Sequence, residues 1–88
     1  MKLIITIVPD SDTDAISSAL TSAELRVTTI ASTGGFLRRG HSTLLIGLED
    51  EQVEQALQII RTTSGKSNEP ANRRGVIFVL KVDQYFHL

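Results

Sequence analysis

The chain has no cysteine and only two histidines in 88 residues. Without cysteine, neither disulfides nor thiolate metal sites can stabilise it. His41 and His87 do not stand at the spacing of paired metal ligands on a helix, so we expect no metal centre and no cofactor. No nucleophile-elbow or catalytic-triad spacing is present either. We therefore predict that the protein is not an enzyme.

A strong charge of one sign is also lacking. The chain has nine basic and ten acidic residues, which gives a formal net charge of −1. This balance argues against a binder of nucleic acid polymers, because such proteins usually present a strongly basic face. No apolar run approaches the roughly 20 residues that span a bilayer, and the apolar stretch after Met1 has no signal-peptide cleavage site. We expect a cytoplasmic protein that does not act at a membrane.

The length of 88 residues suits one small domain, which we take to span residues 1–88. A chain of this size buries only around 60–65% of the surface that it exposes when unfolded. Its stability is therefore marginal on its own. Because disulfides are excluded, oligomerisation is the remaining common way to increase that stability.

The apolar patterns predict two helices among four strands. The segments with strand character are Lys2–Val8, Leu25–Ser32, Ser42–Leu48 and Gly75–Val82. One helix is expected to start at Ser11, which stands in a capping-box-like relation to Asp14, and the other to run from Val53 to near Thr63. The resulting βαββαβ order predicts an α+β, ferredoxin-like fold with a four-stranded antiparallel sheet and both helices on one face.

The predicted strands are apolar on both faces, as where Leu3, Ile5 and Ile7 alternate with Ile4 and Val8. Two helices cover only one face of a sheet, and a face in contact with water would show a clean polar alternation. We therefore predict a homo-oligomer that buries the second face. The alternative is a monomer with an exposed apolar sheet face.

The segment Ser32–Gly40 (STGGFLRRG) joins the second and third predicted strands. Its glycine pair, Gly34 and Gly35, permits positive φ and close approach of a ligand to the backbone. Successive N–H groups in such a turn form anion-binding concavities. An apolar pair and two arginines follow the glycines, so the segment indicates a site for a phosphate-bearing ligand. A hairpin loop with arginines in solvent is the plainer alternative.

Arg26 and Thr28 share the strand face that we expect at a subunit boundary. A buried arginine is costly unless it meets an anion. The anion is either a carboxylate in an intersubunit salt bridge, such as Asp83 or Glu24, or a ligand phosphate. The planar guanidinium suits both phosphates and the faces of bases. The sequence leaves both readings open.

The segment RVTTIASTGGFLRRG at Arg26–Gly40, together with FVLKVDQYF at Phe78–Phe86, resembles the PII-like cyclic di-AMP receptor proteins of bacteria. The opening LIITIVPD and the SGK sequence after the second helix are also similar to that family. The resemblance covers nearly the whole chain. It implies a small cytoplasmic homotrimer that binds cyclic di-AMP between neighbouring subunits and signals, without catalysis, to an unknown protein target.

The resemblance also implies which residues bind the ligand. These residues are Glu24, Arg26, Thr28, Gly35, Phe36, Leu37, His41 and Gly47. Among them, Glu24 and His41 stand where the family has asparagine, and the segment Ser64–Arg74 is much shorter than the family's loop. The alternatives are a PII-like trimer that binds another adenine nucleotide or a small anion, and a trimer similar to the divalent-ion tolerance proteins.

Overall fold

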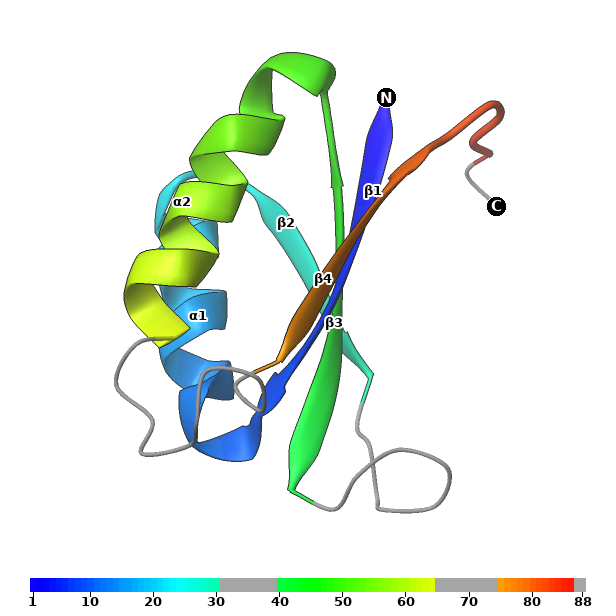
Figure 1. The fold of residues 1–88 in the computed structure, drawn as a ribbon. Helices are drawn as coiled ribbons and strands as arrows, with labels where there is room; N and C mark the ends of the chain where they lie inside the picture. The colour runs from blue at the N-terminus through cyan, green and yellow to red at the C-terminus, as the bar shows by residue number, and fades with distance from the viewer. Residues whose placement is uncertain (31–39, 65–74, 87–88) are drawn as a thin grey trace.

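The computed structural model describes residues 1–30, 40–64 and 75–86. Its elements follow the predicted order: β1 (Lys2–Pro9), α1 (Asp10–Ser22), β2 (Arg26–Ile30), β3 (His41–Leu48), α2 (Val53–Thr63) and β4 (Val76–Lys81). The strands form one layer, and both helices lie on the same side of it (Figure 1). No helix in the described ranges is long and apolar enough to cross a membrane.

The strands form one antiparallel sheet in the order β2-β3-β1-β4. The central strands β1 and β3 pair with each other, and β2 and β4 form the edges. This is the order expected when right-handed crossovers connect a βαββαβ chain. The prediction of a ferredoxin-like fold with a four-stranded antiparallel sheet is therefore confirmed.

The hydrophobic core lies between the sheet and the helices. Ile4 of β1 aligns with Ile46 of β3 and Val79 of β4 on the helix face of the sheet. The buried apolar residues of the core are Ile4, Val8, Ile16, Leu20, Leu25, Leu44, Ile46, Leu48, Ala56 and Ile60. Along most of β1 and β3, buried residues alternate with more exposed ones, because side chains alternate between the two faces of a strand.

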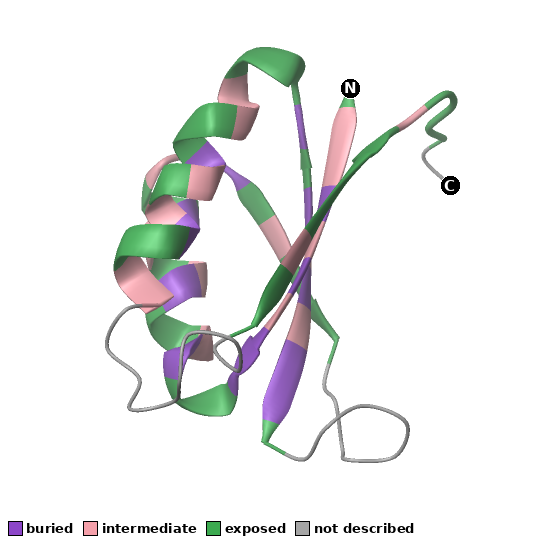
Figure 2. Cartoon of the chain, in the orientation of Figure 1, coloured by how far each residue is buried: buried purple, intermediate pink, exposed green. Residues whose placement is uncertain are grey.

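The opposite face of the sheet, which we call the open face, has three rows of residues. From β2 to β4 the rows are Arg26–Gly47–Leu3–Leu80, Thr28–Leu45–Ile5–Phe78 and Ile30–Thr43–Ile7–Val76. No described helix covers these rows. Every residue in them is exposed or intermediate, and Figure 2 colours these two classes green and pink. Phe78 is 50% exposed and Leu80 is 45% exposed. The sheet is thus apolar on both faces, as predicted.

The start of α1 differs from the prediction. The helix begins at Asp10, with Pro9 at the N-cap, and no side chain caps it. Asp10 is held in place because its N–H donates to the Gly40 carbonyl (2.6 Å) and its carboxylate accepts the Ser42 hydroxyl. The predicted start at Ser11, with its capping-box relation, was therefore wrong.

A capping box occurs instead at Glu49, before the 3₁₀ turn that leads into α2. The N–H of Glu49 donates to Oε1 of Gln52 (2.9 Å), and the Glu49 side chain accepts from the backbone of Gln52 in return. The capping box thus provides partners for the N–H groups of Glu49 and Gln52, and the Gln52 N–H also donates to the Glu49 carbonyl (2.9 Å).

Candidate functional site

A pocket of about 250 Å³ lies at one end of the open face. Its lining residues are Met1, Leu3, Arg26, Thr28, Leu45, Gly47 and Tyr85. Arg26 and Gly47 are directly opposite each other on β2 and β3, and Thr28 follows in the next row. The pairing of these two strands therefore brings three of the predicted ligand residues into one pocket.

Among the described residues that line this pocket, Arg26 is the only one with a charged side chain, and it is exposed. Within the described ranges the one ion pair joins the N-terminal amino group to Asp50 (3.4 Å). Neither Asp83 nor Glu24 therefore pairs with Arg26 inside the chain. No described carboxylate of the chain therefore forms a salt bridge with Arg26. The exposed guanidinium is placed to receive an anion at an otherwise largely apolar pocket.

Gly47 supplies open space in the pocket. A Cβ added to Gly47 would meet only the Met1 Cε, at 3.6 Å, which is an ordinary contact. Its φ is not positive, so the backbone conformation does not require glycine. Nothing described inside the chain explains a glycine here. The space would admit a molecule that approaches the strand backbone from outside the chain.

Tyr85 is a pocket residue that the sequence prediction did not select. It follows β4, is 56% exposed, and lines the same pocket as Met1 and Leu3. The sequence feature that could have identified Tyr85 was its position in the FVLKVDQYF segment, which resembles the family. An exposed aromatic ring offers a surface on which a nucleotide base stacks.

Glu24 lies beside the pocket, in a neighbouring hollow that Arg26 also lines. It has a positive φ of 65°. The N–H of Glu24 donates to the Thr21 carbonyl (2.9 Å) and that of Leu25 to the Leu20 carbonyl (3.0 Å). These two bonds form a Schellman motif, which ends α1 and normally places glycine or asparagine where Glu24 stands.

Glu24→Gly is expected to raise the free energy of unfolding by about 0.5–1 kcal/mol, because glycine adopts positive φ without the steric cost of a Cβ. Glu24→Asn should change it in the same direction, since asparagine tolerates this conformation. Urea unfolding without nucleotide measures both changes. Glu24→Ala is the matched control, because it removes the carboxylate and keeps the Cβ. Equal stabilisation by alanine would assign the effect to charge and not to the backbone.

His41 lies apart from the pocket. It is the first residue of β3, opposite Pro9, and is 8% exposed. Gly47 is six positions further along the same extended strand, which corresponds to about 20 Å. The structure therefore does not bring His41 together with Arg26 and Gly47 in one chain.

The remaining predicted ligand residues, Gly35, Phe36 and Leu37, lie outside the described residues, as does His87. Their assignment to the ligand site stays a prediction. The described part of the site thus consists of the Arg26, Thr28 and Gly47 cluster with Tyr85, and of Glu24 beside it.

The fold and the pocket define a ferredoxin-like α+β protein with a candidate ligand site on its open sheet face. A family model described as "Cyclic-di-AMP receptor" matches residues 1–74, and the chain belongs to this family. Among solved structures, it is similar to a functionally unknown protein from Pediococcus pentosaceus ATCC 25745. The two sequences are 34% identical over 99% of this chain and 96% of that chain, with a TM-score of 0.81. The family predicted from the sequence is confirmed.

Proposed function

We propose that this chain is a non-enzymatic sensor that binds cyclic di-AMP between neighbouring copies of a homotrimer. Membership in the cyclic-di-AMP receptor family supports the ligand. The observation that carries the proposed site is the pocket that combines the Arg26 guanidinium, the Thr28 hydroxyl and the open space at Gly47.

The pocket residues match the parts of a cyclic dinucleotide. The guanidinium of Arg26 binds a phosphate through two parallel N–H···O bonds, and the Thr28 hydroxyl adds a further donor. Gly47 lets the ligand approach the strand backbone. The Tyr85 ring provides a stacking surface for one adenine. Each of these groups lines the same pocket.

The size of the pocket supports a site shared between subunits. Its volume of about 250 Å³ lies below the roughly 300–1,000 Å³ of typical small-molecule sites. One chain therefore encloses only part of a dinucleotide, and a neighbouring copy would complete the site. The uncovered apolar rows of the open face provide the surface for that copy, because large exposed apolar patches are rare in monomers.

Phe78→Lys is expected to convert the oligomer into a monomer, because it would bury an unpaired charge between open faces. Val79→Lys is the matched control. Val79 is the next residue, is similarly exposed (42% against 50%), and lies on the opposite face. Light scattering at micromolar concentration measures the mass of both variants. A monomeric wild-type protein, or an oligomer in Phe78→Lys, would contradict the proposed assembly.

Thermal denaturation with separate additions of cyclic di-AMP, cyclic di-GMP, ATP, ADP and AMP tests the proposed ligand. A ligand at about 100 times its Kd adds about 2.7 kcal/mol of stability, which raises the Tm of a domain of this size by about 10 °C or more. We expect this rise with cyclic di-AMP. A comparable rise with ATP alone would favour a PII-like sensor of another adenine nucleotide. No rise with any of the five would refute the proposal.

A further inference from the structure

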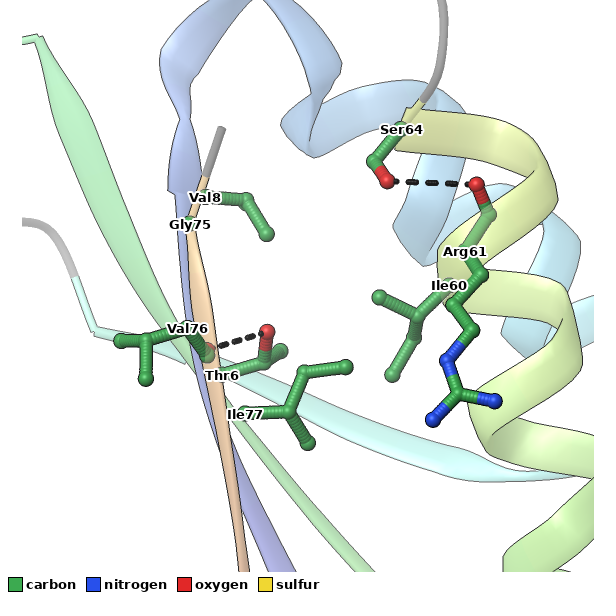
Figure 3. A pocket seen from close by; sticks show the side chains of 8 residues that line it. All are labelled: Thr6, Val8, Ile60, Arg61, Ser64, Gly75, Val76 and Ile77. Carbon is green, nitrogen blue, oxygen red and sulfur yellow. Dashed lines mark hydrogen bonds between the residues drawn. The ribbon is translucent and has the colours of Figure 1, made fainter. Parts of the chain in front are cut away.

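A second cavity, of about 290 Å³, lies on the helix face of the sheet, between α2 and β4 (Figure 3). Val8, Ile60 and Ile77 contribute apolar side chains to it, and Arg61 and Ser64 lie on its α2 side. The sheet separates this cavity from the pocket of Arg26, which opens on the opposite face. The two cavities are therefore separate from each other.

The cavity forms because α2 packs mainly against α1 and makes few contacts with β4. The floor at β1 contains one polar side chain, Thr6, whose hydroxyl donates to the Val76 carbonyl (3.0 Å). This bond satisfies the hydroxyl, so the floor behaves as an apolar surface. Val79, further along β4 on the same face, is 42% exposed. The apolar surface therefore continues from the cavity along the strand.

The outer edge of β4 borders this surface. In the described part of the sheet β4 pairs only with β1, so its other edge has no strand partner. Such an edge presents unpaired N–H and C=O groups and is a template for an added strand. The sequence Val76–Lys81 (VIFVLK) contains no proline or bulge-forming glycine, and one charge stands at its end. Alternate side chains of an added strand would point toward the helix face, where the cavity begins.

Two features of the cavity indicate what kind of group it would bind. The cavity volume of about 290 Å³ lies just below the roughly 300–1,000 Å³ of typical small-molecule sites, so it suits one bulky side chain better than a whole cofactor. Arg61 is the only charged residue among the described residues that line it, is exposed, and forms no ion pair with a described residue. Its charge favours an acidic group in the occupant.

We infer that the edge of β4 and the α2–β4 cavity together bind an extended peptide segment of a partner protein. The segment adds to β4 through backbone hydrogen bonds, inserts an apolar side chain into the cavity, and places an aspartate or glutamate beside Arg61. Because this groove faces away from the open face, the inference does not rest on the proposed nucleotide site. It gives the protein a docking surface for a target while the open face is covered.

The test uses the full chain as bait for phage-displayed random peptides, followed by fluorescence anisotropy with the selected peptide. We expect a consensus with a bulky apolar residue within two positions of an acidic one. Arg61→Glu should weaken peptide binding at least tenfold and leave cyclic di-AMP binding unchanged. Arg26→Glu, the matched charge reversal on the other face, should leave peptide binding unchanged. This crossed pattern separates failure of the peptide site from failure of the nucleotide site.

Amide hydrogen exchange provides the second measurement. The bound peptide should slow exchange in Val76–Lys81 and not in β2, which forms the other edge of the sheet. The inference is overturned if no consensus emerges, if Arg61→Glu binds the peptide as well as wild type, or if β4 gains no protection. Arg61-dependent binding of octanoate without any such peptide would identify a site for small amphipathic anions and would also overturn it.

Discussion

Gly75→Ala is expected to lower the free energy of unfolding by about 3 kcal/mol or more, because the backbone at this position excludes a side chain. Gly75 precedes β4 and has a φ of +141°, which L-residues rarely adopt. A Cβ there would overlap the carbonyl oxygen of Ile7 and lie 3.3 Å from the Val8 Cα. These are backbone atoms of the central strand β1, so they cannot move aside without disturbing the sheet.

Gly47→Ala is the matched control for this prediction. It makes the same chemical change, but its Cβ would meet only the flexible end of Met1 at 3.6 Å. We expect its stability to stay within about 0.5 kcal/mol of the wild type. Urea unfolding of both variants at one protein concentration measures the difference, and the concentration is fixed because oligomers gain stability by mass action. If the two variants had equal urea midpoints, the backbone at the start of β4 would accommodate alanine as readily as glycine.

The expected loss is large for a chain of this length. A folded chain of 88 residues has a total stability of roughly 4–13 kcal/mol, at about 0.05–0.15 kcal/mol per residue. A change of about 3 kcal/mol therefore removes a substantial share of it. Gly47→Ala serves a second purpose, because it fills the pocket without disturbing the fold. It should weaken nucleotide binding if a ligand approaches the backbone there.

The fold was predictable because its signals are periodic. The alternation of Leu3, Ile4 and Ile5 assigned strand faces that the observed register reproduces. The handedness of crossovers then left one plausible strand order. The start of α1 was not predictable from caps alone. Ser11 has the usual N-cap chemistry, but the contacts of Asp10 with Gly40 and Ser42 join residues far apart in sequence.

The candidate site was only partly predictable. Arg26 and Thr28 could be placed together because they are two residues apart on a strand, and Gly47 joined them through the β2–β3 register. Tyr85 follows the last strand in a segment without periodicity, so no pattern placed it at the pocket. The positive φ of Glu24 could not be predicted from the sequence, because glycine and asparagine are the residues that usually indicate this conformation.

Arg26→Ala is expected to weaken cyclic di-AMP binding about 30-fold or more, with little change in the Tm of the free protein. Removing one partner of a desolvated charge pair costs about 2–5 kcal/mol of binding free energy. The free protein should tolerate the change, because Arg26 is exposed and forms no ion pair with a described residue. Calorimetric titration and thermal denaturation of the same samples measure the two quantities.

Arg61→Ala is the matched control, because it removes the same exposed charge from the opposite face and should leave cyclic di-AMP binding unchanged. Arg26→Lys keeps the charge but loses the planar fork, so it should restore only part of the affinity. If Arg26 instead completes an intersubunit salt bridge, Arg26→Ala should lower the Tm and dissociate the oligomer without nucleotide. A variant that binds cyclic di-AMP as tightly as the wild type would show that the phosphates lie outside the Arg26 pocket.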